Sequence, residues 1–563
     1  MKIATKAPRC QGTPGSFNQT PTPAPAGAVF TPEEKEQILD EYNEIISELG
    51  ALNNYSLEWL CHPISEKNDL TPENLLDRLI DFLTFHRVVS KAGKSAPALA
   101  RWLKKWIKKT LRLFTGAIQQ QYWFMKCRPL WKRLDENKTY TVIRTWFDGR
   151  SRALMENDKD IYFGRLPGFL KKNGLHVLYF GEFAYGFEHE FDNITRGLED
   201  PVILGRSLVH GWDFVKGYCF QFSASRRIKL QPGLKILGVD VDAVFRNYFQ
   251  AHSQDQEIRA NFLSYRAAVK LTKKIKIDRV YMPFENYAWE KLTHLALLKV
   301  FGGQGTAPSL RAFQKGPLPP EAKVISFQHA QVALNAAKFF MGEKERHSIV
   351  FPDRIVTVGD VTRNFLIEKK HYPAERVITG CALRQDYVIS GERVERKQTR
   401  RVLAQLWSVE KSARLINFIH AAGIHPGKYH VTISPHPCNP LEKLIPHLDF
   451  QYKDHFTLFT GSLKESFSVN DLVIYHGTTA CLDALANGLP VINVEFDDFI
   501  TVDPLFEFHD FKWTVSKPEE LAGAIDAIYA LSDEEYYQRQ QKGFEFVKNY
   551  FYPVTEENMK KFL

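Results

Sequence analysis

A pair of threonines at a predicted helix start is the sharpest chemical feature of the sequence. Within DLVIYHGTTACLDALANGLPVINVEF (471–496), an apolar strand ends in Gly477-Thr478-Thr479 and a helix follows. The first N–H groups of a helix have no partner within the helix and carry a partial positive charge. This turn is therefore suited to bind a phosphate, with the two hydroxyls as further donors. The alternative is an ordinary strand-to-helix turn with hydroxyl caps.

A histidine between two prolines lies some forty residues earlier. Ser434-Pro435-His436-Pro437 comes at the end of the predicted strand YHVTIS (429–434). Ligands of open α/β sheets bind beyond the carboxyl ends of the strands, so we expect His436 to face the same side as the threonines. Its ring can donate a hydrogen bond to an anion or to a leaving phosphate. A capped loop histidine is the alternative.

Three further reactive side chains directly follow predicted strands earlier in the chain. The strands and the residues after them are YTVIRTWF with Asp148, RVYMPF with Glu285 and KVISFQ with His329. A carboxylate at such a position can act as a general base or as a nucleophile, and a histidine can assist it. Solvated loop acids and a capping histidine are the alternative. Asp240 and Asp242 are the next candidates if Asp148 and Glu285 are not catalytic.

The motifs of the C-terminal half together resemble those of known transferases. The series of strand, HGTTA, LDAL and NGLPVI is similar to the donor-binding half of glycosyltransferases with the GT-B architecture. A His-Pro followed by a Thr-Thr pair resembles the motifs of bacterial sialyltransferases and Kdo transferases, which bind CMP-activated acidic sugars. The resemblance implies that the donor is bound by Ser434, His436, Pro437, Gly477, Thr478 and Thr479. Only Asp148-Gly149 approximates the acidic motif of those sialyltransferases, with Phe147 where its first acid should stand.

Residues 140–560 also resemble proteins of surface carbohydrate biosynthesis. The two resemblances imply transfer of a Kdo-like or sialic-acid-like sugar from a CMP-sugar to a glycolipid or to a surface polysaccharide such as lipopolysaccharide or capsule. Asp148 and Glu285 are then the catalytic candidates with His329 as helper, and both inversion and retention stay open. The candidates to bind the sugar carboxylate, because guanidinium groups bind carboxylates in bidentate fashion, are Arg150, Arg152 and Arg384.

No metal and no cofactor other than the donor is expected. Asp497-Asp498 follows a predicted strand, but two adjacent acids are typical of a solvated turn. Seven scattered cysteines without a CxxC spacing argue against a zinc site and a disulfide framework, and they favour a reducing cytoplasm.

Two other hypotheses about the function stay open. A GT-B transferase or an epimerase that uses a UDP- or GDP-sugar would share this architecture. A nucleic-acid-binding protein is the alternative from another class, because residues 91–133 hold twelve Lys or Arg and no Asp or Glu. The whole chain carries +9, so the remainder is slightly acidic. With no recognised nucleic-acid module in the chain, no nucleic-acid partner is expected.

Strands that alternate with helices would position these residues. Such alternation predicts an α/β fold of two tandem Rossmann-like domains, 136–390 and 391–563, the first on the acceptor and catalytic side and the second binding the donor. The polar stretch 389–401 separates the two series of strands, although a single large α/β domain is the alternative. A helical region (31–135) and a Pro- and Thr-rich disordered tail (1–30) are expected before them.

The helical region carries a basic amphipathic segment. Thr31-Pro32-Glu33-Glu34 and Thr71-Pro72-Glu73-Asn74 are typical helix starts, and RWLKKWIKKTLRLF follows. An apolar face opposite a basic face predicts that residues 99–118 attach the chain peripherally to the cytoplasmic face of the cell membrane. The alternative is that this face packs on the catalytic domains. No apolar run approaches the length of a membrane span, and no signal peptide is recognised.

Overall fold

The computed structural model describes most of the chain. The described residues are 30–67, 74–88, 99–184, 187–301, 323–330, 334, 336–348, 350–384, 392–424, 427–435, 439, 441–496 and 501–563, of which 85–88, 99–112, 299–301 and 347 are described by their backbone alone. The expected tail (1–30) lies outside them except for its last residue, and so do the side chains of most of the basic amphipathic segment.

The first domain is built on a seven-stranded parallel sheet. Its order is β3-β2-β1-β6-β7-β8-β9. The strands are β1 (Thr139–Phe147), β2 (His176–Phe183), β3 (Val202–Leu204), β6 (Lys276–Pro283), β7 (Lys323–Phe327), β8 (Arg354–Thr357) and β9 (Val377–Thr379). All residues of β1 except Thr139 and Trp146 are buried, as expected for a central parallel strand covered on both faces. The strand order reverses between β1 and β6.

The second domain repeats this plan with six parallel strands. Their order is β12-β11-β10-β13-β14-β15, so that the order reverses between β10 and β13. The strands are β10 (Arg401–Gln405), β11 (His430–Ser434), β12 (Thr457–Leu458), β13 (Leu472–Tyr475), β14 (Val491–Val494) and β15 (Lys512–Val515). Six strands in this order form the Rossmann arrangement, in which ligands bind outside the carboxyl ends of the strands where the order reverses.

Helices connect and cover the two sheets. In the first domain these are α5 (Ser151–Met155), α6 (Leu166–Lys172), α7 (Phe191–Thr195), α8 (Gly211–Ser223), α9 (Asp242–His252), α10 (Gln256–Lys274), α11 (Ala288–Phe301) and α13 (Asp360–Glu368), with a small hairpin of β4 (Lys235–Ile236) and β5 (Val239–Asp240). In the second domain they are α14 (Val409–Ala421), α15 (Leu463–Val469), α16 (Ala480–Ala486), α17 (Pro518–Ala530) and α18 (Asp533–Tyr550), and a last helix, α19 (Glu556–Lys560), follows near the end of the chain.

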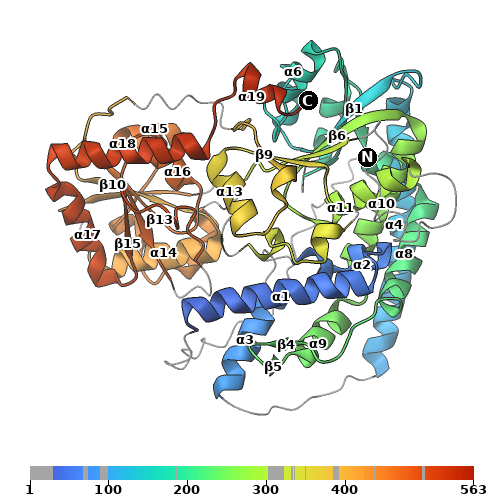
Figure 1. Ribbon diagram of the computed structural model, residues 1–563, viewed down its shortest axis with the longest axis horizontal. Helices are drawn as coiled ribbons and strands as arrows, with labels where there is room; N and C mark the ends of the chain where they lie inside the picture. The colour runs from blue at the N-terminus through green and yellow to red at the C-terminus, as the bar shows by residue number, and fades with distance from the viewer. Residues whose placement is uncertain are drawn as a thin grey trace, which may run out of the picture.

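The N-terminal helices pack into the first domain. They are α1 (Pro32–Leu52), α2 (Leu57–Cys61), α3 (Leu75–Val88) and α4 (Leu99–Trp131). The predicted start of α1 is observed, because Thr31 and Glu34 cap each other's backbone N–H groups. Side chains of α1–α3 share one apolar core with the long crossover that contains α9 and α10. Figure 1 shows α1 running beneath the first sheet, with α3 beside the β4–β5 hairpin.

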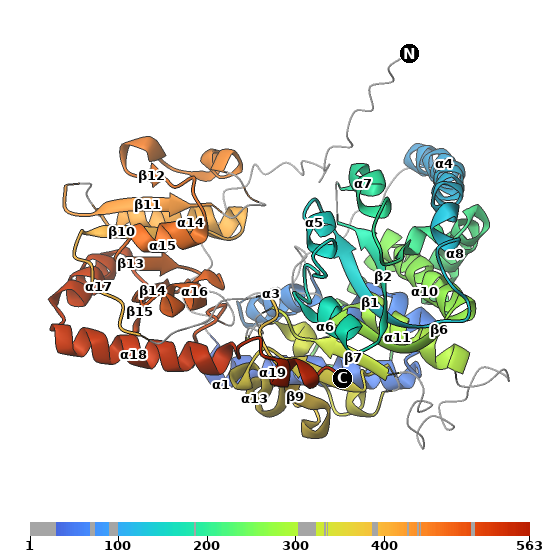
Figure 2. The same ribbon diagram turned by 90° about the horizontal axis from the view of Figure 1, so that it is seen from above.

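The two domains are tied together by the end of the chain. After α18 the chain leaves the second domain, and α19 lies against the first (Figures 1 and 2). Tyr552 bridges two segments of the first domain, since its N–H donates to Val358 and its carbonyl accepts from Ala382, both at 2.9 Å. The Phe562 side chain is completely buried, and its carbonyl accepts a 2.6 Å hydrogen bond from the Tyr281 hydroxyl.

The expectation of an α/β fold with two parallel sheets behind a helical N-terminal region is confirmed. Every run assigned to a strand from its apolar pattern forms one, and these runs also include LHVLYF (β2), RIVTVG (β8), RVITGC (β9), VLAQLW (β10) and LPVINV (β14). Strands β3, β12 and β15 and the β4–β5 hairpin were not predicted.

Replacement of Phe562 by alanine should destabilise the protein by about 3–5 kcal/mol, because a fully buried aromatic ring is lost between the chain end and the first sheet. Calorimetry or urea unfolding measures the change. Ile445→Ala, at a largely exposed position in the second domain, is the matched control and should change stability little. Equal stability of the two variants would show that the chain end is not anchored as described.

Candidate functional site

Two predicted acids flank the point where the order of the first sheet reverses. Asp148 follows β1 and Glu285 follows β6, and these are the two strands on either side of the reversal. His329 comes two residues after β7, the neighbour of β6. The topology therefore gathers all three predicted catalytic residues at the carboxyl ends of adjacent strands, where open α/β sheets bind ligands.

Glu285 and His329 form a partly buried pair. The His329 Nε2 atom lies 3.3 Å from Glu285 Oε1, and the imidazole is almost completely buried while the carboxylate stays about one-third exposed. Burial lowers the pKa of His329, which favours the neutral ring. Burial would raise the pKa of Glu285, but contact with His329 and the charges of Lys338 and Arg384 hold it below its ordinary value. At neutral pH the pair is therefore a carboxylate beside a neutral imidazole.

Tyr162 stands between the predicted residues. Its ring meets the His329 ring edge-on at 4.7 Å, and the Arg384 guanidinium lies 5.8 Å from its centre. Burial and the carboxylates of Glu285 and Asp148, among others, raise the pKa of the Tyr162 phenol to about 12, and Arg384 opposes them. We call Asp148, Tyr162, Glu285, His329 and Arg384 the Tyr162 cluster.

A tight turn holds Tyr162 in this place. Asp160 and Gly164 exchange two backbone hydrogen bonds of 2.9 Å, and the Asp160 carboxylate accepts the Tyr162 N–H at 2.8 Å. Gly164 has φ +47°, and a Cβ atom there would lie 2.0 Å from the Leu383 carbonyl oxygen. Only glycine allows this approach, which brings the turn against the segment that contains Leu383 and Arg384.

The predicted arginines differ in what they contact. Arg150 is exposed and pairs with Asp148 at 2.7 Å, and the same carboxylate also accepts the Arg150 N–H at 2.8 Å. Both oxygens of Asp148 are thus engaged within its own turn. Arg152 points away from the cluster, to Glu156 at 2.8 Å and to the carbonyl of Arg196 at 3.0 Å. Of the three, the structure places Arg384 beside Glu285.

A buried carboxylate supports the segment that carries Glu285. Glu290, at the start of α11, accepts the backbone N–H of Glu285 at 3.0 Å and that of Asn286 at 2.9 Å. Burial and the charge of Glu285 raise the pKa of Glu290 well above its usual range. Asn286 has φ +60°, an unusual conformation for a residue other than glycine, which these two hydrogen bonds help to hold.

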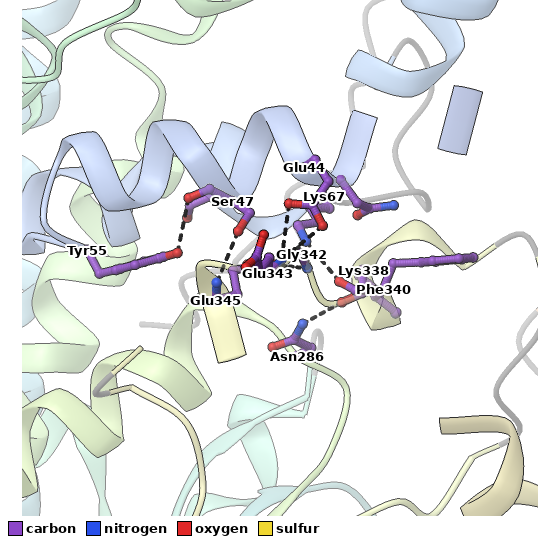
Figure 3. Close-up of polar contacts among 12 residues, drawn as sticks. Glu44, Ser47, Tyr55, Lys67, Asn286, Lys338, Phe340, Gly342, Glu343 and Glu345 are labelled. Carbon is purple, nitrogen blue, oxygen red and sulfur yellow. Dashed lines mark hydrogen bonds and ion pairs between the residues drawn. The ribbon is translucent and has the colours of Figure 1, made fainter. Parts of the chain in front are cut away.

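The N-terminal helices hold the same segment from the other side. The Glu66 carboxylate accepts the Ala288 N–H at 3.0 Å. Figure 3 shows the neighbouring contacts, in which Lys67 pairs with Glu345 at 2.5 Å and Ser47 accepts the Glu345 N–H at 3.0 Å. Between these helices and the sheet lies a cavity of about 40 Å³, large enough for water. The helical region thus supports the backbone that directly follows Glu285.

The predicted donor turn lies at the reversal point of the second sheet. Gly477 follows β13 with φ +66°, and a Cβ atom there would lie 2.8 Å from Val502 and 3.3 Å from the Trp407 ring. Thr478 is buried and its hydroxyl accepts the Ala480 N–H at 3.4 Å, whereas Thr479 is exposed at the start of α16. Glycine is required here both for its conformation and for the close approach of Trp407, which follows β10.

A buried ion pair lies beneath this turn. Lys512 of β15 contacts Asp503 at 2.7 Å, and the other carboxylate oxygen accepts the Tyr475 hydroxyl at 2.5 Å. All three side chains are buried. The pair connects the end of β13 with the segment that contains Val502, and so fixes what Gly477 packs against.

Several predicted residues cannot be placed. His436, Pro437 and Asp497-Asp498 lie outside the described residues, while Ser434 ends β11 and its carbonyl accepts the Leu406 N–H at 3.1 Å.

In the described part of the chain, no group of three or more His, Cys, Asp or Glu could hold a metal ion. No helix of the described ranges is long and apolar enough to cross a membrane. The absence of a catalytic metal stays a prediction.

Sequence reasoning missed two contributors to the site. Tyr162 comes from the connection between β1 and β2, and the turn signal in DIYFG (160–164) is the feature that could have pointed to it. Glu290 follows Glu285 by five residues, and no local pattern distinguishes it from a solvated acid. Asp242, a fallback candidate, instead accepts the N–H groups of Gly233 and Leu234 at the β4–β5 hairpin.

No protein-family model and no curated protein matches the sequence. Among solved structures, a glycosyltransferase from Rickettsia africae ESF-5 has a TM-score of 0.39 at 12% identity and covers 75% of this chain and 96% of its own. A UDP-GlcNAc 2-epimerase from Methanocaldococcus jannaschii has 0.37 at 11%, covering 73% and 99%. The glycosyltransferase SnogD from Streptomyces nogalater has 0.39 at 13%, covering 76% and 99%. Overlaps this loose carry no conclusion about activity.

The contact between Glu285 and His329 predicts a specific titration. His329 should titrate below its ordinary pKa of about 6.5, and Glu285→Gln should lower that pKa further, because the lost carboxylate stabilises the protonated ring. The folded protein then binds fewer protons than the unfolded chain below about pH 6.5, so its stability falls as the pH falls, and falls more in the variant. NMR of the imidazole nitrogens measures the pKa. Equal His329 pKa values in the unchanged protein and in the variant would contradict the contact.

Proposed function

We propose that the chain is a glycosyltransferase of GT-B architecture that uses a nucleotide-activated sugar. The observation that carries the proposal is the pairing of two Rossmann-order sheets whose reversal points hold complementary groups. The first carries the Glu285–His329 pair, and the second carries a glycine-threonine turn that opens a helix. Group transfer from a nucleotide-sugar needs both a base for the acceptor hydroxyl and a seat for the leaving phosphate.

The donor belongs at the second domain. Gly477, Thr478 and Thr479 are proposed to bind its phosphate, together with Ser434, His436 and Pro437. The half-buried Trp407 ring closes one side of this turn. A CMP-activated acidic sugar of the Kdo or sialic-acid type is the proposed donor, from the motif resemblance. A UDP- or GDP-sugar, in a transferase or in an epimerase, fits the same architecture equally well.

Catalysis is assigned to the Tyr162 cluster. Glu285 is the proposed base, because its carboxylate is ionised at neutral pH and about one-third exposed, while contact with His329 orients it. Asp148 is the weaker candidate, since both its oxygens are used within its turn. Arg384 is exposed and is proposed to pair with the carboxylate of an acidic sugar. The reaction proposed here involves no metal.

The acceptor is proposed to be a lipid-linked or surface-polysaccharide saccharide. A peripheral contact with the inner face of the membrane through residues 99–118 would bring the enzyme to such an acceptor. The side chains of 99–112 lie outside the described residues, so this contact rests on their sequence alone.

The donor test compares CMP, UDP and GDP by the melting temperature of the full chain. A nucleotide at a hundred times its Kd stabilises the fold by about 2.7 kcal/mol, so the preferred base should be visible as the largest shift. Thr478→Val and His436→Ala should each reduce that shift. Thr514→Val, an exposed threonine of β15, is the matched control. A larger shift with UDP or GDP would favour the alternative donors, and no shift with any nucleotide would contradict the proposal.

The catalytic test uses the nucleotide-sugar that this comparison identifies. Glu285→Gln should lower kcat by about 10²–10⁴-fold and leave the nucleotide-induced melting shift unchanged, because a base acts in the transition state. Asp148→Asn should lose less, since asparagine keeps an oxygen for the turn. Release of free nucleotide is the readout. Near-normal turnover of the Glu285→Gln variant would show that another residue is the base.

A further inference from the structure

Helix α4 exposes a continuous apolar stripe. Phe114, Ile118, Tyr122 and Met125 follow one another at spacings of four, four and three residues, which places them on one side of the helix. Trp212, at the start of α8, lies beside them, because the Gly211 N–H donates to Gln121 at 3.1 Å. These five side chains, which we call the α4 stripe, are 58–69% exposed. The other exposed large hydrophobic side chains of the described residues are 38–44% exposed and lie elsewhere.

The opposite side of α4 is firmly packed. A Cβ atom on Gly116 would lie 2.3 Å from the Phe214 ring, and Gln120 donates to the carbonyls of Arg206 and Val209 at 2.8 and 2.7 Å. Trp131 donates to the Ser207 hydroxyl at 3.2 Å. Figures 1 and 2 show α4 and α8 side by side at the end of the molecule farthest from the second domain. The stripe therefore cannot turn inward without breaking these contacts.

We propose that the α4 stripe inserts into the interfacial region of an anionic lipid bilayer. Contiguous exposed apolar side chains mark an interaction surface, and a mixture of Phe, Ile, Met, Tyr and Trp is what an interfacial helix presents to a membrane. Tyr and Trp favour the headgroup level, where one end of the ring stays in water. The membrane contact itself does not depend on the proposed function. Its biological role, access to a lipid-linked acceptor, rests on that function.

The positive charge around the α4 stripe favours an anionic bilayer as its binding partner. Residues 91–133, which contain most of the stripe, hold twelve Lys or Arg and no Asp or Glu. Among them Arg128 and Lys132 are exposed and continue the same side of the chain beyond Met125. Basic side chains near an anionic leaflet each add to binding, and salt weakens the attraction. An acid-free apolar stripe of this kind complements anionic lipid.

Vesicle co-sedimentation of the full chain tests the inference without nucleotide or sugar, so its outcome is independent of the proposed activity. Vesicles of phosphatidylcholine with phosphatidylglycerol should bind the protein at low salt, and pure phosphatidylcholine should bind less. A stripe variant with serine at Phe114, Ile118, Met125 and Trp212 should weaken binding by about tenfold or more. Its matched control carries serine at four other exposed apolar positions, Leu52, Ile445, Leu458 and Val469.

The control should bind like the unchanged chain, and so should a third variant with leucine at the four stripe positions. Equal melting temperatures of the three variants would show that the fold is intact. Vesicle binding that is unchanged in the stripe variant would overturn the inference, and so would absence of binding by the unchanged chain. Stripe-dependent dimerisation or stripe-dependent binding of an oligonucleotide, with no vesicle binding, would assign the surface to another occupant.

Discussion

The return of the chain from the second domain to the first is the constraint on which the rest of the structure depends. Tyr552 and Phe562 follow the second domain in the sequence, but they bond to and pack on the first. A second contact reinforces this link, because Phe506 after β14 packs on Phe365 of α13 with ring centres 5.3 Å apart. A helix that follows β8 of the first sheet and a segment that follows β14 of the second are therefore in contact where the two domains touch.

The N-terminal helices extend this logic to the candidate site. They share a core with the crossover helices, and through Glu66 they hold the backbone beside Glu285. A side chain that acts as a general base, the role proposed for Glu285, must be fixed in position but remain accessible. Here the backbone is fixed by buried carboxylates and the side chain by His329, while the carboxylate itself stays partly exposed. Rigidity behind the site and exposure in front of it come from different parts of the chain.

The sequence is sufficient for most of the fold and for part of the site. Strands β1 and β6 could be predicted because each contains a run of buried, mostly apolar residues. Strands β12 and β15 could not, because the first has two exposed residues and the second begins with Lys512, whose burial depends on Asp503. Asp148, Glu285 and His329 were found because each follows a strand. The position of Arg384 near Tyr162 could not be predicted, because it depends on the close contact between Gly164 and Leu383, which are far apart in the sequence.

The support of the Glu285 segment has an electrostatic consequence. The N–H groups of Glu285, Asn286 and Ala288 all point into the protein, toward the buried acids Glu290 and Glu66. What this segment of the first sheet offers outward is the Glu285 carboxylate, which repels an anion unless the anion pairs with Arg384. The helix start at Thr479 on the second sheet has the opposite sign. A phosphate would therefore favour the second sheet, whereas an anionic group at the first sheet would depend on Arg384.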